Sequence, residues 1–97
     1  MRPSEALERH REDIRRLTAS RRAANPRVFG STARGDDVDG SDLDILVDTV
    51  PGTTTLFDLG GLFEDLKAAL GVPIDLVTIR ELPNAIRAKV LAEAKPV

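Results

Sequence analysis

Apolar and polar positions follow a helical spacing in the first part of the chain. Over residues 4–20, apolar side chains recur at this spacing while charged residues fill the other faces; they are Leu7, Ile14 and Leu17. Asn25-Pro26 ends the pattern, because the residue before a proline disfavours the helical region. The sequence therefore predicts a helix over 4–20 and a short strand over 27–29.

The next part of the chain predicts a turn segment and a buried strand. Residues 31–41 are polar and rich in Gly and Asp, which is typical of turns. The apolar run from Leu43 to Val47 predicts a buried strand, and a loop over 49–54 follows it.

A second amphipathic helix is predicted from Thr55 onward. Thr55 has the chemistry of an N-cap, and Asp58 favours the positive end of a helix. Gly71 is placed where a glycine commonly ends a helix. The pair Gly60-Gly61 costs roughly 1 kcal/mol per glycine relative to alanine, so the first turn is expected to be loose. The apolar stripe consists of Leu59, Leu62, Phe63, Leu66 and Leu70.

The last elements complete a predicted α+β fold. Ile74 to Ile79 predicts a third strand, and Pro83 opens a helix to about Ala94, with Leu82, Ile86 and Val90 on one side. Strands one and two are expected to be antiparallel, since only a turn separates them. Strands two and three are expected to be parallel, through a right-handed helical crossover. The result is a small mixed sheet of three core strands with helices packed on it.

Length and composition limit the class of protein. The 97 residues suit one domain over 1–97 with a modest core, and 41% apolar residues suit a globular fold. Without cysteine there is neither a disulfide framework nor a thiolate metal site. No apolar run approaches ~20 residues and no signal-peptide core is present, so we expect a cytoplasmic protein without membrane contact.

The net charge of −2 hides an asymmetry. Residues 1–30 carry eight Arg against four acidic residues, a balance of +4, whereas 31–97 carry six Lys or Arg against twelve acidic residues, a balance of −6. The arginines of 1–30 form a solvated helix face or bind an acidic partner or RNA phosphates. No aromatic residues are interleaved with them, so direct nucleic-acid binding through base stacking is not expected.

Two closely spaced aspartates begin the second predicted strand. Because side chains alternate on a strand, Asp42 and Asp44 are expected on one face, opposite the apolar residues of the same run. Two such carboxylates repel each other unless a cation lies between them, and hard oxygen ligands select Mg²⁺ or Mn²⁺. Asp75 is a lone charge in the third apolar strand, and it is either hydrogen-bonded to a neighbouring loop or part of this site. Three carboxylates can hold two metals roughly 3.5–4 Å apart, which suits in-line phosphoryl displacement.

The segment before these aspartates has the composition of a phosphate-binding loop. Gly30 permits close approach of the backbone to a phosphate, and the Ser31 hydroxyl and following N–H groups can donate to phosphate oxygens. Arg34 offers a fixed fork of donors for the same oxygens. Ser41 can cap the turn or contact a phosphate. Three further loop aspartates are expected to be merely solvated: Asp36, Asp37 and Asp39.

Together these motifs resemble the DNA-polymerase-β-like nucleotidyltransferase superfamily, in particular its minimal nucleotidyltransferases, the antitoxins of HEPN/MNT toxin–antitoxin pairs. The resemblance rests on Gly30-Ser31, Ala33-Arg34-Gly35 and Ser41-Asp42-x-Asp44-Ile45. It continues in Pro73-Ile74-Asp75-Leu76-Val77 and a closing helix, and it covers roughly residues 27–94. It implies a polymerase β-like nucleotidyltransferase fold.

The resemblance also implies transfer of AMP from ATP onto a hydroxyl, with release of pyrophosphate. In the antitoxin members the acceptor is a tyrosine of the partner HEPN ribonuclease, which is thereby silenced. The implied catalytic and Mg²⁺- or Mn²⁺-binding residues are Asp42, Asp44 and Asp75. The implied nucleotide-binding residues are Gly30, Ser31, Arg34 and Ser41.

Three hypotheses of function follow. The chain contains no Tyr, so a tyrosine acceptor must belong to another molecule. The first hypothesis is a protein adenylyltransferase that acts on a cognate HEPN toxin. The second is an antitoxin that neutralises its toxin by binding and occlusion with little chemistry, and the third is an enzyme on a small molecule, completed by a partner chain. The three intact carboxylates favour chemistry over occlusion.

Overall fold

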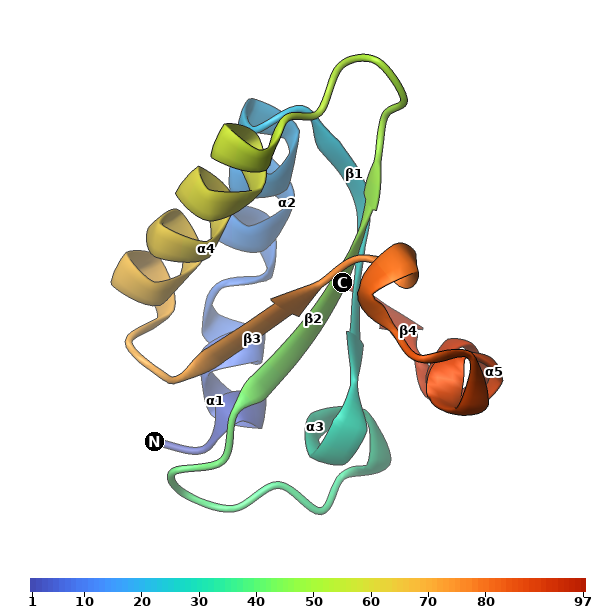
Figure 1. Cartoon of the computed structure of the whole chain (residues 1–97). Helices are drawn as coiled ribbons and strands as arrows, with labels where there is room; N and C mark the ends of the chain where they lie inside the picture. Colours follow the sequence, from blue (N-terminus) through green and yellow to red (C-terminus); the bar gives the residue numbers. More distant parts are fainter.

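A four-stranded mixed sheet organises the computed structural model, which describes residues 1–97 (Figure 1). The strand order is β3-β2-β1-β4, where β1 is antiparallel to both β2 and β4 and β2 is parallel to β3. The strands are β1 (Ala23–Phe29), β2 (Leu43–Thr49), β3 (Ile74–Val77) and β4 (Lys95–Pro96). The predicted α+β class and both predicted pairings are confirmed. The fourth strand was not predicted, because two residues carry no periodicity.

Helices cover both faces of this sheet, unequally (Figure 1). The helices are α1 (Pro3–Arg9), α2 (Arg11–Ser20), α3 (Gly30–Arg34), α4 (Leu56–Leu70) and α5 (Asn84–Glu93), with a 3₁₀ turn η1 (Ile79–Glu81). Figure 1 shows α1, α2 and α4 on one side of the sheet and η1 and α5 on the other. None of the helices combines the length and apolar character that a membrane crossing requires.

The sheet separates two apolar clusters. The larger one lies beneath α1, α2 and α4 and includes Leu43, Ile45 and Val47 of β2. The smaller one lies on the other face and consists of four buried residues, namely Phe29, Leu46, Leu82 and Val90. Because side chains alternate along β2, Asp44 shares the face of the smaller cluster. Few apolar side chains are buried on that face, so polar side chains such as Asp44 can be accommodated there.

The predicted N-terminal helix is wrong in one respect, because it is divided in two. His10 lies between α1 and α2 with φ −127° and ψ 22°, and its ring contacts Asp13 in the first turn of α2 at 2.9 Å. Leu7 and Ile14 remain buried on either side of the break. The hydrophobic spacing therefore continues in phase across it, so the pattern alone cannot reveal the break.

The prediction of a polar turn segment over 31–41 is wrong for its first residues. Its first residues form the short helix α3, which ends at Gly35 in the left-handed conformation (φ 81°). Asp37 is buried and accepts the backbone N–H of Ser4 at 2.9 Å, and this bond lowers the pKa of Asp37. Asp37 is thus a link between the loop and α1, whereas Asp36 and Asp39 are exposed as expected.

Three element boundaries differ from the prediction. Strand β1 starts at Ala23 because its pairing with β2 tolerates an irregularity between Ala24 and Arg27, which accommodates Pro26. Strand β3 stops at Val77, and the following residues turn into η1. Helix α5 ends at Glu93, and Ile86 is 44% exposed, although it was predicted on the same side as the buried Leu82 and Val90. Only Val90 of α5 is buried, because this helix contacts the sheet mainly through one residue.

Helix α4 begins and ends as predicted, but its first turn is closed by a capping box. The Thr55 hydroxyl accepts the Asp58 N–H at 3.1 Å, and the Asp58 carboxylate accepts the Thr55 N–H at 2.9 Å. Gly71 follows the helix with φ 68°. This capping box satisfies two otherwise free N–H groups and opposes the looseness expected of the first turn, which stays a prediction.

The two central glycines of α4 have different surroundings. A Cβ at Gly60 would meet nothing, whereas a Cβ at Gly61 would lie 2.5 Å from the Cζ atom of Arg21. That guanidinium forms an ion pair with Asp65 at 2.9 Å, which ties α2 to α4. Gly61 therefore leaves the space through which the Arg21 side chain reaches its partner.

We predict that Gly60→Ala raises the free energy of unfolding by about 0.5–1 kcal/mol, because alanine loses less backbone entropy in a helix. Gly61→Ala should gain clearly less, because the new methyl group displaces Arg21 from Asp65. Denaturant unfolding of both variants measures the difference. Equal gains for the two variants would contradict the role assigned to Gly61.

Candidate active site

Three neighbouring strands bring Gly30, Asp44 and Asp75 together. Phe29, directly before Gly30, is paired with Asp44 in the antiparallel register of β1 and β2. Asp44 is paired with Asp75 in the parallel register of β2 and β3. The three residues therefore form a row across the sheet, on the face that carries η1 and α5.

Asp44 lies at the electrostatic centre of this row. Its partial burial, and then the nearby carboxylates of Asp75 and Asp42, raise the pKa of Asp44 from 3.8 to about 6, against the opposing effect of Arg34. Asp75 and Asp42 are exposed. Asp42 directly precedes β2 instead of belonging to it, so strand alternation does not place its side chain. Its charge nevertheless acts on Asp44, as the raised pKa shows.

The carboxylates suit a hard divalent cation by their chemistry. They supply only oxygen donors, which Mg²⁺ and Mn²⁺ prefer, and two of them are adjacent in register. No three acidic or histidine side chains in the chain converge at metal-binding distances. Three like charges have no mutual attraction that would draw them together. The oxygen donors of Asp44 and of its neighbour Asp75 are chemically suited to such a cation, and a metal site that also includes Asp42 stays a prediction.

Gly30 is required by both its backbone and its neighbour. Its φ is 69°, a left-handed value that costs other residues roughly 1–2 kcal/mol. A Cβ at this position would also collide with Oδ2 of Asp44. The absence of a side chain therefore lets the first turn of α3, which carries Ser31, lie directly against the carboxylate.

Arg34 ends α3 and is held by two acidic side chains. Its Nε donates to Asp36 at 3.4 Å, and its Nη1 lies 3.3 Å from Oε2 of Glu93. Oε1 of Glu93 also accepts the backbone N–H of Gly30 at 2.9 Å. Sequence reasoning missed Glu93. An available signal was the acidic residue in the last turn of a helix, where the helix dipole disfavours negative charge.

Ser41 has a structural role at the end of the loop. Its hydroxyl accepts the backbone N–H of Val38 at 3.1 Å and closes the turn that leads into β2. Of the two expected roles, the cap is therefore present in the structure. The contact of Ser41 with a phosphate stays a prediction, as do the catalytic and nucleotide-binding roles of the other site residues.

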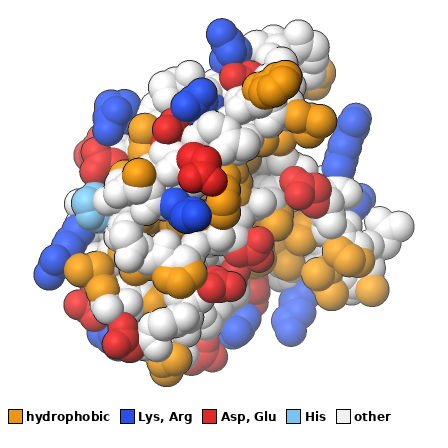
Figure 2. Space-filling model, turned by 60° about the vertical axis from the view of Figure 1, so that its left-hand side comes forward, with side chains coloured by type: hydrophobic (Ala, Val, Ile, Leu, Met, Phe, Trp, Pro, Cys, Tyr) orange, Lys and Arg blue, Asp and Glu red, His pale blue; other side chains and the backbone are white.

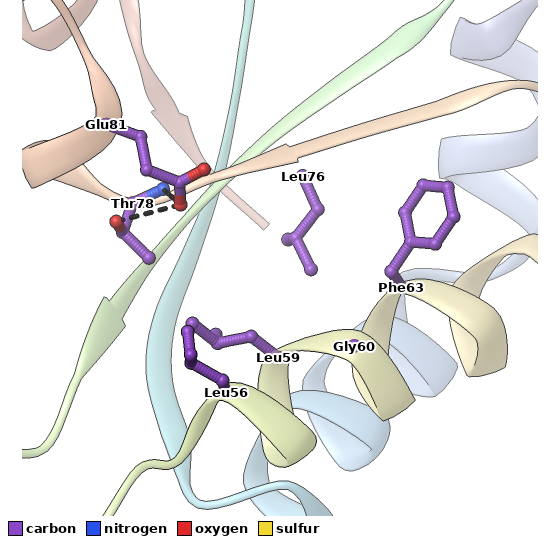
Figure 3. A pocket seen from close by; sticks show the side chains of 7 residues that line it. All are labelled: Leu56, Leu59, Gly60, Phe63, Leu76, Thr78 and Glu81. Atoms are coloured by element: carbon purple, nitrogen blue, oxygen red, sulfur yellow. Dashed lines mark hydrogen bonds between the residues drawn. The ribbon is translucent and has the colours of Figure 1, made fainter.

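A separate apolar groove lies between α4 and β3, away from this row (Figure 3). It measures about 240 Å³ and is lined by Leu56, Leu59, Gly60, Phe63, Leu76, Thr78 and Glu81. Leu76 packs against the larger cluster, on the face opposite Asp75. The one acidic residue that lines the groove, Glu81, accepts hydrogen bonds from both the N–H and the hydroxyl of Thr78 at 3.0 Å (Figure 3). The groove is therefore mainly apolar, and one oxygen of its single carboxylate is engaged by Thr78.

The arginines of 1–30 are mostly neutralised in place. Seven of the eight form ion pairs, namely Arg2, Arg11, Arg15, Arg16, Arg21, Arg22 and Arg27. In Figure 2 basic and acidic side chains are interspersed over the visible face and do not gather into one basic patch. The solvated helix face, one of the two expectations for these residues, agrees with this arrangement.

Comparisons with known proteins agree on one family. The model of the nucleotidyltransferase domain family matches residues 7–97. Protein adenylyltransferase MntA of Thermococcus cleftensis is 36% identical over 89 residues, which cover 90% of this chain and 84% of that protein. A solved structure named as a minimal nucleotidyltransferase has a TM-score of 0.85 and 42% identity, covering 97% of this chain and 95% of that chain. A toxin–antitoxin structure with AMP-PNP has a TM-score of 0.72 and 25% identity, covering 88% and 69%.

The crowded carboxylates lead to a stability prediction. Because the folded-state pKa of Asp44 lies above its unfolded value, the folded state binds more protons, and stability falls as the pH rises from about 4 through 6. Asp44→Asn should therefore raise the free energy of unfolding at pH 7.5 by about 1–2 kcal/mol in metal-free buffer, after allowance for solvent screening.

The gain should shrink towards zero near pH 4, where the wild-type carboxyl is protonated in the native protein. Denaturant unfolding of both proteins at the two pH values measures this difference. A gain that is equal at both pH values, or a loss of stability at pH 7.5, would contradict the proposed charge repulsion.

Proposed function

This chain belongs to the nucleotidyltransferase domain family, and from that premise we propose that it transfers AMP from ATP onto a hydroxyl of a partner toxin protein. The observation that carries the proposal is the row of Gly30, Asp44 and Asp75, with Arg34 at its edge. The named activity of the Thermococcus cleftensis relative supports the reaction type. The toxin–antitoxin structure with an ATP analogue supports both the nucleotide and the class of partner.

The residues divide the work according to their positions. Ser31 and Arg34 bind the triphosphate from α3, since Arg34 supplies charge-assisted hydrogen bonds and Ser31 a hydroxyl donor. Asp44 and Asp42 hold Mg²⁺ or Mn²⁺, with Asp75 beside them. The cation, when bound, offsets the negative charge of the phosphates and of the clustered carboxylates.

Asp75 serves the acceptor side of the reaction. The acceptor oxygen attacks the α-phosphorus, the bond from that phosphorus to the α,β-bridging oxygen breaks, and pyrophosphate leaves. The hydroxyl proton passes to the Asp75 carboxylate, which is exposed and therefore open to an incoming molecule. Since the chain contains no Tyr, a tyrosine acceptor lies on the partner, which we propose to be a HEPN-type ribonuclease silenced by the modification.

The first test concerns the nucleotide. Charge-assisted hydrogen bonds contribute about 1.5–3 kcal/mol each, so Arg34→Ala should weaken MgATP binding roughly ten- to a hundredfold. The melting temperature should change little, because Arg34 is exposed. Isothermal titration calorimetry measures the affinity, with Glu64→Ala as the control for loss of an exposed charged side chain on α4. Unchanged affinity and kinetics would show that Arg34 has no part in nucleotide binding.

The second test concerns the acceptor. Asp75→Asn should retain MgATP binding but lose transfer, because the substitution removes the proton acceptor and keeps the shape of the side chain. Mass spectrometry of the co-expressed toxin should show adenylyl adducts with the wild type and with Glu64→Gln, and none with Asp75→Asn. A toxin that is fully inhibited yet unmodified by the wild type would instead favour neutralisation by binding and occlusion.

A further inference from the structure

Glu93 connects the C-terminal helix to Gly30 and Arg34, two of the residues proposed to bind the nucleotide. Its Oε1 accepts the N–H of Gly30 at 2.9 Å, and both of its carboxylate oxygens lie within 3.4 Å of Nη1 of Arg34. Its side chain is only 19% exposed, so the contacts are shielded from solvent on most sides. One carboxylate therefore fixes a backbone donor and a guanidinium at the same time.

The position of Glu93 in α5 is unfavourable unless its carboxylate has compensating partners. Glu93 is the last residue of the helix and the only acidic one in it. Carbonyl groups at the end of a helix carry partial negative charge, so an acid there is unfavourable unless another group compensates it. The N–H of Gly30 and the charge of Arg34 supply that compensation. Helix propensity alone does not account for an acid at this position.

The contacts with Asp36 and Glu93 determine which nitrogens of Arg34 remain free to bind an anion. The guanidinium of Arg34 uses Nε for Asp36 and Nη1 for Glu93. Because a guanidinium is planar and rigid, fixing two of its nitrogens also fixes the direction of the third. Its Nη2 group donates no hydrogen bond to either acid. Two N–H donors of known direction thus remain for an anion.

Glu93 is itself held in place by the end of the chain. Ala94 leads directly from Glu93 into β4, whose Lys95 pairs with Val28 of β1, two residues before Gly30. On the preceding turn of α5, Val90 packs in the smaller cluster with Phe29. The carboxylate is therefore anchored on both sides to the strand that ends at the phosphate-binding loop.

We propose that Glu93 is a positioning residue of the nucleotide site, which fixes the start of α3 through the Gly30 N–H and holds Arg34 so that its free Nη2 group receives the triphosphate. This inference rests on the proposed function, because it assumes that Arg34 binds nucleotide. It adds a residue of the C-terminal helix to a site otherwise built from residues 30–44 and Asp75. The opposite role is that of an internal anion that competes with phosphate, and it makes the opposite prediction for affinity.

The test compares MgATP binding by Glu93→Ala, Glu93→Gln and Glu64→Ala, measured by calorimetry well below the melting temperature. Loss of orientation at Arg34 should weaken binding about tenfold in Glu93→Ala, the size of one hydrogen-bond contribution. Glu93→Gln should lose less, because its amide oxygen still accepts the Gly30 N–H. Glu64→Ala removes an exposed acid from α4 and should bind as the wild type does.

A double-mutant cycle with Arg34→Ala separates positioning from a general loss of structure. If Glu93 acts through Arg34, the tenfold effect of Glu93→Ala should fall to about twofold or less when Arg34 is already absent. In transfer assays the KM for ATP should rise more than kcat falls. The conservative Glu93→Asp variant, which retains the charge, should recover part of the lost affinity.

The outcomes distinguish the hypotheses. Tighter binding by Glu93→Ala would show that Glu93 competes with phosphate and would overturn the inference. Unchanged binding, or effects of Glu93→Ala and Arg34→Ala that simply add, would also overturn it. If the wild type does not bind MgATP at all, the proposed function fails instead, whatever the variants do.

Discussion

The structure depends on a register that places two carboxylates side by side against a glycine. The pairing of β1, β2 and β3 sets Asp44 beside Asp75 and next to Gly30, and this arrangement raises the pKa of Asp44. Such proximity opposes folding, because like charges are brought together and partly desolvated. The fully buried Leu43 and Ile45 offset it, since a shift of register by one residue would move them out of the larger cluster. The same register thus stabilises the core and concentrates charge at the site.

The contact of α5 with α3 brings residues from distant parts of the sequence to the candidate site. The segment proposed to bind phosphate follows β1, and the last helix returns to that strand through β4. Glu93 joins these parts through Gly30 and Arg34, across 63 and 59 positions of sequence. The guanidinium of Arg34 is therefore held from two sides, by Asp36 of the loop and by Glu93 of α5. Val90 is the only buried residue of α5, which gives the Glu93 contact greater weight.

The sequence was sufficient to predict the features that depend on residues close together in the chain. The Thr55 cap, the glycine that ends α4 and the pairing of the three main strands all follow from short segments. Strand periodicity and the crossover also indicated that Asp44 and Asp75 would be neighbours. The contacts that the sequence did not predict involve residues far apart in the chain. Asp37 is buried because α1 lies against it, and Glu93 matters because α5 returns to Gly30. Neither contact leaves a periodic signal in the sequence.

The uneven covering of the sheet constrains how an acceptor can reach the site. The face beneath α1, α2 and α4 is filled by the larger cluster, so no substrate can approach Asp44 from that side. The other face has only four buried apolar residues, and Asp75 is exposed on it at the edge strand β3. In the proposed transfer, the acceptor hydroxyl therefore arrives across this open face, from a molecule that docks beside β3. Because the chain has no tyrosine of its own, a tyrosine acceptor in the proposed reaction belongs to a second chain, to which the exposed Asp75 is accessible.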